Sequence, residues 1–326
     1  MTVRDVVIVG SGPAGLTAAL YNARANLDVL CIAGYEAGGQ LMLTTDVENY
    51  PGFPEGIQGP DLMQKFRDQA ARFGTDFIDR DATDADLSSR PFTIEVEDET
   101  VKARSVIIAT GASARWLGLP DEESYRGKGI STCATCDGAF FKDKEVVVVG
   151  GGDSAMEEAL FLTKFADQVT IVHRRDEFRA SQIMADRALE HEDIEVLWNT
   201  EAIAYLGDPT IEGLRLIKHP DGRPKKRIPD DEWANADEHG GKVYDFATDG
   251  VFIAIGHDPN TPFLEGEIEL DEKGYVEVEG HTRTDVDGVF AAGDVHDKHY
   301  RQAVTAAGLG CRAAMDTEQW LEAQDD

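Results

Sequence analysis

The sequence predicts an α/β protein built from two Rossmann-like domains, and three observations lead to this prediction. A buried strand, a glycine-rich turn and a helix follow one another within residues 6–24, and again within residues 145–165. The two copies stand about 140 residues apart, which is the usual size of one domain. With 326 residues the chain is long enough for two such domains, and a third is not expected.

The first copy begins with residues 6–9, a β-branched run typical of a strand buried on both faces. The strand leads into a G-x-G-x-x-G turn, and residues 16–24 have helical composition. This order is the dinucleotide-binding fingerprint, in which the three glycines serve a tight turn, approach to a pyrophosphate and helix–strand packing. The helix amides then face the phosphates. The turn consists of Gly10, Ser11, Gly12, Pro13, Ala14 and Gly15.

The segments after this helix predict further parts of the same nucleotide site. The strand at residues 29–32 contains Cys31, which we expect to be a buried core thiol. The fingerprint expects an acid at the end of this strand for the ribose hydroxyl, and Glu36 is the nearest candidate. Residues 38–41 and 48–52 predict polar loops, and the strand at 106–109 points Gly111 toward the first turn.

The second copy follows a strand at residues 145–149 and has the variant pattern G-x-G-x-x-A, from Gly150 to Ala155. Its next strand, residues 169–172, carries no acid at its end. A basic cluster stands there instead, formed by His173, Arg174, Arg175 and Arg179. Because guanidinium groups match phosphate geometry, this cluster predicts a site for the 2′-phosphate of NADP.

The C-terminal third predicts one more strand, at residues 288–292, which ends in Gly293 and Asp294. An aspartate at this place can accept hydrogen bonds from a polyol chain. The last helix opens at residues 300–303, with small residues suited to close approach to a flat cofactor. The charged stretch between residues 219 and 241 predicts a surface loop.

A C-x-x-C pair, Cys133 and Cys136, precedes the second glycine-rich turn. Two cysteines at this spacing form either a reducible disulfide or half of a zinc site. The acid directly after the pair, Asp137, favours the redox alternative, because thiol–disulfide exchange needs protons delivered and removed locally.

The composition excludes several classes of partner. Acids outnumber bases 62 to 31, and the formal net charge of −31 repels nucleic acid and anionic membranes. Such self-repulsion needs screening by salt, so we expect a halophilic source. Four cysteines, no apolar run of about 20 residues and a strand almost at the N-terminus predict a cytoplasmic protein.

In this order, the motifs resemble those of the low-molecular-weight thioredoxin reductases, over essentially the whole chain. The resemblance implies a discontinuous FAD-binding domain, residues 1–114 and 251–326, with an NADPH-binding domain at 115–250 inserted into it. Both would be Rossmann-like domains of the three-layer ββα type, and the inserted one carries the C-x-x-C pair. The resemblance also implies a homodimer. Together with the net charge, it leads us to expect a halophilic archaeal source and loss of the folded dimer at low ionic strength.

The same resemblance implies the ligand sets, without a metal. FAD would be held by the first fingerprint together with Glu36, Gly39, Gln40, Leu41, Asn49, Thr110, Gly111, Gly293, Asp294, Arg301, Gln302 and Ala303. NADPH would be held by Gly150, Gly152, Asp153, Ser154, His173, Arg174, Arg175 and Arg179.

The mechanism implied by the resemblance passes electrons from NADPH to the flavin and then to the Cys133–Cys136 disulfide. Cys136 would lie against the flavin, Cys133 would attack the disulfide of thioredoxin or a thioredoxin-like protein, and Asp137 would be the general acid–base group. One domain would rotate against the other between the two half-reactions, with hinges near residues 112–115 and 251–256.

Four alternatives compete with this interpretation of the sequence. Related ferredoxin–NADP reductases lack a redox-active cysteine pair, and peroxiredoxin-reducing relatives carry an additional N-terminal domain. A structural zinc site would need Cys31 and Cys311 beside the C-x-x-C pair, and these lie in distant segments of the sequence. Related flavoproteins that act on small disulfides, or that oxidise dithiols, differ in the partner that meets Cys133.

Overall fold

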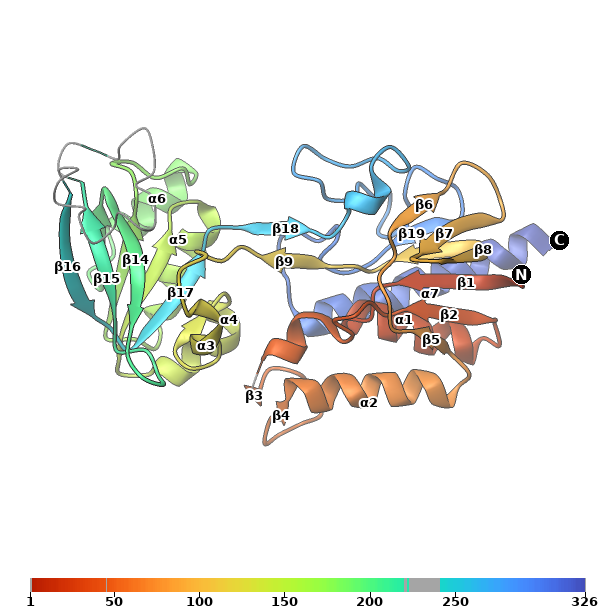
Figure 1. The fold of residues 1–326 in the computed structure, drawn as a ribbon, viewed down its shortest axis with the longest axis horizontal. Helices are drawn as coiled ribbons and strands as arrows, with labels where there is room; N and C mark the ends of the chain where they lie inside the picture. Colours follow the sequence, from red (N-terminus) through yellow and green to blue (C-terminus); the bar gives the residue numbers. More distant parts are fainter. Residues whose placement is uncertain (1, 45, 220–221, 223–240, 326) are drawn as a thin grey trace. The chain divides into compact units, whose positions relative to one another are not determined.

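The computed structural model describes residues 2–44, 46–219, 222 and 241–325, so most of the charged stretch after residue 219 lies outside the described residues. The chain divides into two compact units (Figure 1). Unit 1 comprises Met1–Ser113 and Asp258–Asp326, and unit 2 comprises Ala114–His257. Each unit contains its own parallel sheet and hydrophobic core, as expected for two Rossmann-like domains.

Unit 1 is built on a sheet with the strand order β5-β2-β1-β8-β7-β6, in which β19 also pairs with β8. The neighbours β5, β2, β1, β8 and β19 run parallel, whereas β6 and β7 are antiparallel additions. The strands span β1 (Val3–Val9), β2 (Val29–Ile32), β5 (Asp76–Ile78), β6 (Asp84–Asp86), β7 (Phe92–Val96), β8 (Glu99–Ile108) and β19 (Val289–Ala291).

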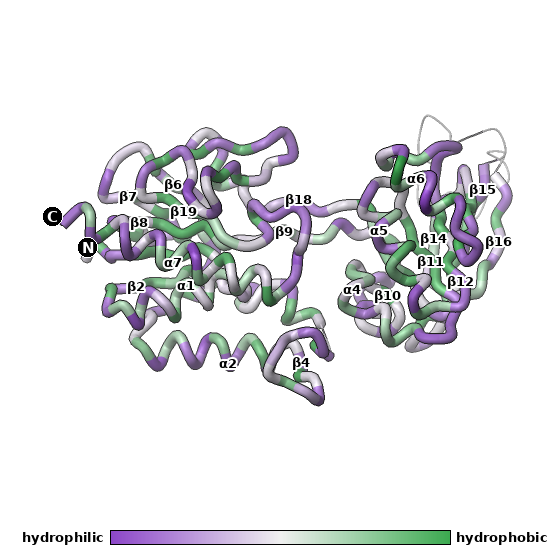
Figure 2. Tube along the Cα trace, turned by 180° about the vertical axis from the view of Figure 1, so that it is seen from behind, coloured by the Kyte–Doolittle hydropathy of each residue, from purple (hydrophilic) through white to green (hydrophobic). Residues whose placement is uncertain are grey.

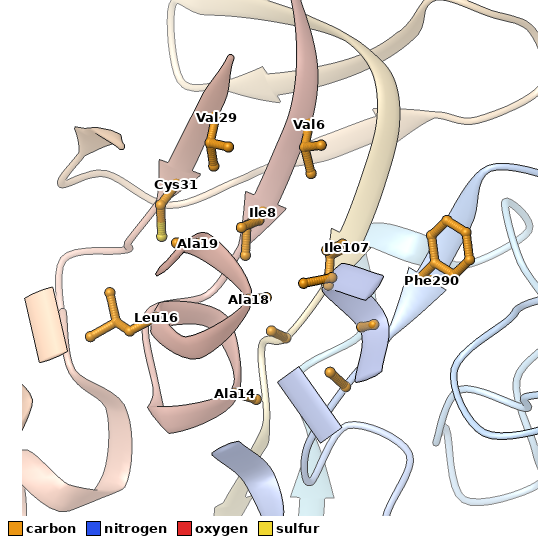
Figure 3. Packing of buried hydrophobic residues seen from close by; sticks show 14 of the residues in the cluster. Val6, Ile8, Ala14, Leu16, Ala18, Ala19, Val29, Cys31, Ile107 and Phe290 are labelled. Atoms are coloured by element: carbon orange, nitrogen blue, oxygen red, sulfur yellow. The ribbon is translucent and has the colours of Figure 1, made fainter. Parts of the chain in front are cut away.

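Helices cover one face of this sheet. Because side chains alternate along each strand, every second residue points toward these helices. Val6 and Ile8 of β1 and Ile107 of β8 point toward an alanine-rich helix, α1 (Pro13–Arg24) (Figure 3). Cys31 belongs to the same core and is fully buried, as predicted. The other helices of this layer are α2 (Gly59–Arg72) and α7 (Ala303–Asp325), and the short elements are η1 (Gly39–Leu43), β3 (Asp46–Val47), β4 (Ile57–Gln58) and η4 (Pro262–Leu264).

Unit 2 has three layers. The middle layer is a parallel sheet in the order β10-β17-β11-β12-β13, composed of β10 (Ile130–Ser131), β11 (Glu145–Gly150), β12 (Gln168–His173), β13 (Ile194–Trp198) and β17 (Gly250–Ala254). Figure 2 shows apolar β11 next to more polar outer segments. The antiparallel layer consists of β14 (Thr200–Leu206), β15 (Gly213–Lys218) and β16 (Lys242–Ala247), and the helical elements are α3 (Glu122–Tyr125), α4 (Ala134–Asp137), η2 (Gly138–Phe141), α5 (Asp153–Leu162) and α6 (Gln182–Leu189).

The alternation of valines along β11 explains this layering. Val146 and Val148 pack with α5, whereas Val147 and Val149 pack with residues of β14 and β15. One β-branched run therefore faces a helix on one side and a second sheet on the other, which gives the expected ββα arrangement.

The chain passes between the units through β9 (Ala112–Ala114) and β18 (His257–Pro259), which pair with each other. The boundary expected between residues 250 and 251 falls inside β17, which belongs to unit 2. Because β17 is paired with β10 on one edge and β11 on the other, it completes the sheet of unit 2 before the chain leaves that unit.

The contact between α1 and α7 yields a test of packing in unit 1. A Cβ at Gly310 would lie 2.1 Å from the Ala14 carbonyl oxygen, whereas a Cβ at Gly308 meets no described atom within 4 Å. We expect Gly310→Ala to lower the free energy of unfolding by about 2 kcal/mol or more. The matched Gly308→Ala variant should raise it by about 0.5–1 kcal/mol, because alanine favours helix. Equal denaturant midpoints for the two variants would contradict this description.

Candidate functional site

The first candidate site lies at the carboxyl edge of the unit 1 sheet. Strands β1, β2, β8 and β19 run parallel and in register, so all four end at the same edge. The segments that follow them are the glycine-rich turn, Ala33, Thr110–Gly111 and Gly293–Asp294. Ligands of open α/β sheets bind at this edge.

The glycines of the first turn are needed for two different reasons. Gly10 has a φ of +107°, and a Cβ there would lie 2.3 Å from the Ala109 carbonyl oxygen. At Gly15 a Cβ would lie 1.9 Å from the carbonyl oxygen of Gly10. Packing of the protein itself therefore requires these two glycines. Gly12, the N-cap of α1, has no described atom within 4 Å of its Cβ position, so open space lies in front of the helix N-terminus.

Ser11 connects this turn to the loop that follows β2. Its buried hydroxyl donates to the Ala33 carbonyl oxygen at 2.7 Å and accepts from the Gly38 amide at 2.9 Å. The next residue, Gly39, places its Cβ position 3.4 Å from the Cα atom of Gly12. The predicted residues Gly39, Gln40 and Leu41 are thereby held beside the first turn, in η1, whereas Glu36 is exposed in the preceding turn.

Segments from the end of the chain complete the first site. The Cβ position of Gly293 lies 2.9 Å from the Cβ atom of Ala14, so the turn after β19 lies against the start of α1. Burial, and then the nearby Asp297 carboxylate, raises the pKa of Asp294 to about 6. The Asn49 side-chain amide donates to Gln302 Oε1 at 3.3 Å. Two predicted residues from opposite ends of the sequence are thus in contact, and Ala303 begins α7 just after them.

The residues of this edge fit a bound dinucleotide such as FAD. Two buried polar atoms, Thr110 Oγ1 and Arg301 Nε, have no hydrogen-bond partner among the described residues. Buried polar groups in native proteins are almost always paired, so these two atoms fit a site at which a polar ligand binds. The open space at Gly12 would let the pyrophosphate of a dinucleotide approach the helix amides.

Sequence reasoning missed Asn260 at this site. Its side-chain amide donates to the Thr110 carbonyl oxygen at 2.9 Å, and its backbone amide donates to that of Gly111 at 3.0 Å. Asn260 therefore shapes the turn after β8 from a position far along the chain. The one local signal for Asn260 in the sequence is the turn around it, which contains glycine and proline.

The second candidate site lies at the carboxyl edge of the unit 2 sheet. A Cβ at Gly150 would lie 2.4 Å from the Ala254 carbonyl oxygen, so packing against β17 requires this glycine. Gly152 is the N-cap of α5 and has no described atom within 4 Å of its Cβ position. Asp153 accepts both the amide and the hydroxyl of Ser181 at 2.8 Å, and Ser154 follows it in the first turn of the helix.

His173, the first residue of the basic cluster, is buried. Its Nε2 atom is 2.9 Å from the Glu177 carbonyl oxygen, and its ring fills the space beside Gly151. Burial lowers the pKa of His173, which favours a neutral ring that supports the turn. The Arg179 amide donates to the Gly151 carbonyl oxygen at 2.7 Å. This bond ties the segment that carries the predicted arginines to the second fingerprint, and the open N-terminus of α5 fits the pyrophosphate of NADPH.

Cys133 and Cys136 form a disulfide at the same edge of the unit 2 sheet. They follow β10, which pairs in parallel with β17, and β17 pairs in parallel with β11. Cys133 is the N-cap of α4, and its sulfur accepts the Cys136 amide at 3.2 Å. Burial raises the pKa of Asp137, while a hydrogen bond from Ser131 opposes this shift. A raised pKa keeps the carboxyl group protonated closer to neutral pH.

The zinc alternative has no support in these contacts. Cys31 and Cys311 are free cysteines, and burial raises the pKa of the Cys31 thiol to about 12, so it stays protonated. Zinc binds the thiolate form. The described ranges contain no group of three or more histidines, cysteines and acids that could hold a metal ion. None of the helices in the described part of the chain combines the length and apolar character needed to cross a membrane.

Comparison with known proteins connects the two sites to a family. The profile of the pyridine nucleotide-disulphide oxidoreductases matches residues 4–310. A thioredoxin reductase of Mycolicibacterium smegmatis is 54% identical over 99% of this chain and 98% of its own. The bifunctional thioredoxin reductase/thioredoxin of Mycobacterium leprae is 48% identical over 98% of this chain and 66% of its own. The solved structure of a thioredoxin reductase from Giardia duodenalis has a TM-score of 0.88 at 42% identity, and covers 99% of this chain and 100% of its own.

The chain belongs to the pyridine nucleotide-disulphide oxidoreductase family. Within this family, the relatives named above are thioredoxin reductases that match it over nearly its full length. The α/β fold, the family and the oxidoreductase class predicted from the sequence are thereby confirmed.

The open space at Gly152 gives a test of the second site. We expect Gly152→Val to fold with a denaturant midpoint close to that of the wild type, because a Cβ there meets no described atom within 4 Å. The Kd for NADPH should rise at least about 10-fold, because the side chain would stand between the pyrophosphate and the amides of α5. Titration of the protein with NADPH measures this. A control, Gly150→Ala, should destabilise unit 2 through its clash with Ala254. Unchanged NADPH affinity in Gly152→Val would show that no pyrophosphate approaches this turn.

Proposed function

We propose that this protein is an NADPH-dependent, FAD-containing thioredoxin-disulfide reductase. The observation that supports this most directly is the placement of the Cys133–Cys136 disulfide at the same sheet edge as the second nucleotide fingerprint. In this position the disulfide would receive reducing equivalents that originate from the bound coenzyme, and would pass them to an acceptor disulfide. The full-length similarity to enzymes named thioredoxin reductase supports the choice of acceptor.

FAD, when bound by unit 1, supplies the two-electron chemistry that links the nicotinamide to the disulfide. The first fingerprint would hold its pyrophosphate at the N-terminus of α1. Asp294 would accept hydrogen bonds from the ribityl hydroxyls, and the orphaned atoms of Thr110 and Arg301 would find partners in the cofactor. Glu36, Gln40, Asn49 and Gln302 would make the remaining polar contacts, with Ala303 leaving room at the start of α7.

The NADPH site would use the open N-terminus of α5 and the turn after β12. Gly152 and Ser154 would line the pyrophosphate, and Arg174, Arg175 and Arg179 would bind the 2′-phosphate. Charge-assisted bonds from guanidinium groups distinguish a phosphorylated from a free ribose. Asp153 and His173 would act through the backbone that they hold in place.

The reduced cysteine pair would transfer electrons by thiol–disulfide exchange. The Cys133 thiolate would attack one sulfur of the thioredoxin disulfide, forming a mixed disulfide and releasing the other sulfur as a thiolate. Asp137 would give that thiolate a proton. The Cys136 thiolate would then attack Cys133 Sγ, which closes the enzyme disulfide and releases reduced thioredoxin.

The two half-reactions would require the units to move. The disulfide and the NADPH site belong to unit 2 and the FAD site to unit 1, so nicotinamide and disulfide would reach the flavin in turn. Rotation about the connecting segments would permit this. Since β17 is paired with β10 as far as Phe252 and with β11 as far as Ala254, the second hinge would lie after Ala254, and the first near residues 112–115. We also propose that the enzyme is a cytoplasmic homodimer adapted to high salt.

Removing either sulfur tests the proposed activity. The flavin-loaded protein should oxidise NADPH in the presence of oxidised thioredoxin, and Cys133→Ser or Cys136→Ser should lower kcat at least about 1,000-fold, because no disulfide can form. Flavin absorbance should persist in both variants, which serves as the control. A wild-type protein with full flavin content and no thioredoxin turnover would refute the proposal. Turnover with small disulfides but not with thioredoxin would instead indicate that the protein is one of the related flavoproteins that act on small disulfides.

The basic cluster predicts selectivity for the phosphorylated coenzyme. We expect Arg175→Ala and Arg179→Ala each to raise the KM for NADPH about 10- to 100-fold, because each removes a charge-assisted bond. The KM for NADH should stay within about twofold, since NADH lacks the 2′-phosphate. Arg187→Ala, on the exposed side of α6, is the matched control. A parallel loss with both coenzymes would instead indicate damage to the fold.

Asp137 predicts a characteristic pH dependence. Because burial raises its pKa, the carboxyl group keeps its proton to higher pH than an ordinary aspartate and loses it as the pH rises through the raised pKa. We therefore expect wild-type kcat to fall along a basic limb that Asp137→Asn lacks. The substitution should lower kcat about 100-fold or more. Steady-state rates with oxidised thioredoxin across pH give this comparison, and a retained basic limb in the variant would assign it to another group.

A further inference from the structure

Tyr275 is a buried tyrosine of unit 1 whose hydroxyl group contacts a residue of the first candidate site. It is 2% exposed and follows the turn at residues 271–274. Its hydroxyl oxygen accepts a hydrogen bond from Nη2 of Arg301 at 3.3 Å. Arg301 stands two residues before the start of α7, and its buried Nε atom has no hydrogen-bond partner among the described residues. The tyrosine thus bonds one nitrogen of a guanidinium group in which another nitrogen is unsatisfied.

The surroundings of Arg301 leave its positive charge available for a ligand. Acids outnumber bases 62 to 31 in the sequence, yet no carboxylate in the described part of the chain forms an ion pair with Arg301. Asp294 interacts with its charge but makes no direct contact with it. The backbone of Arg301 has a φ of +46°, in the left-handed region that residues other than glycine rarely adopt. Such conformations persist where the surrounding structure fixes them, and they cluster at ligand sites.

The position of Tyr275 is fixed through its backbone and through its ring. Its amide donates to Asp271 Oδ1 at 2.9 Å, and its carbonyl oxygen accepts the Asp271 amide at 2.8 Å. The ammonium group of Lys298 is ion-paired with the same Asp271 and lies 5.6 Å from the centroid of the tyrosine ring. The next amide, that of Val276, donates to the Val295 carbonyl oxygen at 3.0 Å. These contacts hold the tyrosine beside the turn that follows β19.

We propose that Tyr275 is a positioning residue for Arg301: its hydroxyl group fixes the guanidinium group so that the unsatisfied Nε atom and the positive charge are presented to bound FAD. This inference rests on the proposed FAD site of unit 1. The phosphates of FAD are anionic, and guanidinium groups match phosphate geometry. Tyr275 lies 26 positions before Arg301, outside every motif of the sequence.

A neutral hydroxyl group suits this role better than a carboxylate. An acid in the same place would pair with Arg301 and neutralise the charge that the phosphates would otherwise meet. A hydroxyl oxygen accepts one N–H group and leaves that charge in place. Because Tyr275 is buried, little water competes for the bond, which strengthens it.

Release of FAD from the holoenzyme tests this role without NADPH or thioredoxin. The rate is followed by flavin fluorescence after dilution. We expect Tyr275→Phe to release FAD about 10-fold faster, because a charged N–H group loses its acceptor and the guanidinium group is no longer held. Arg301→Met should release FAD at least as fast. Adding Tyr275→Phe to Arg301→Met should change the rate less than about twofold, because the tyrosine acts through the arginine.

Tyr125→Phe is the matched control, because it removes a tyrosine hydroxyl group of unit 2, one that donates to the Gly207 carbonyl oxygen at 2.7 Å. It should lower the denaturant midpoint and leave FAD release at the wild-type rate.

The outcomes separate the positioning role from the proposed function. A wild-type release rate in Tyr275→Phe would overturn the proposal, and so would an equal acceleration with Arg301 present and with Arg301 replaced. Faster release from Tyr275→Phe, combined with a wild-type protein that holds FAD and does not turn over thioredoxin, would sustain the positioning role and refute the proposed function. A wild-type protein that binds no FAD would refute both.

Discussion

The close approach of backbone to backbone at the two glycine-rich turns is the constraint on which the rest of this structure depends. At Gly10 and Gly15, and again at Gly150, a single added carbon would overlap a carbonyl oxygen of a neighbouring segment. That proximity sets helix against strand and aims the first amides of α1 and α5 at one sheet edge. Gly12 and Gly152 face open space instead, and we propose that their lack of a side chain serves a ligand.

The two units apply this construction to different chemistry. In unit 1, polar groups from four strand ends and the start of α7 gather around the turn, and some of them have no partner among the residues that the structure describes. In unit 2, the same edge carries arginines on one side of β17 and a disulfide on the other. A parallel sheet thus places a coenzyme site and a redox group on one rigid support, although they are far apart in the sequence.

Much of this arrangement was predictable, because its signals are local. The strand–turn–helix pattern, the basic cluster around Arg175 and the C-x-x-C pair each lie within a few residues of sequence. The boundary after residue 250 was less accessible, since β17 resembles any buried strand until its partners β10 and β11 are known. Asn260 carries no motif. It acts through two hydrogen bonds to the backbone of Thr110 and Gly111, and such bonds leave no pattern in composition or spacing.

By itself, the sequence determined the fold class, the two fingerprints, the redox pair and the family, because backbone sterics allow only glycine at the close turns and exchange chemistry requires paired thiols. Only the tertiary structure decided which distant groups meet. It joined Asn49 to Gln302, set Gly293 against Ala14, and partly buried Asp137 after the cysteine pair. Burial and hydrogen bonding set the protonation of an acid, and both depend on neighbours that chain folding alone brings together.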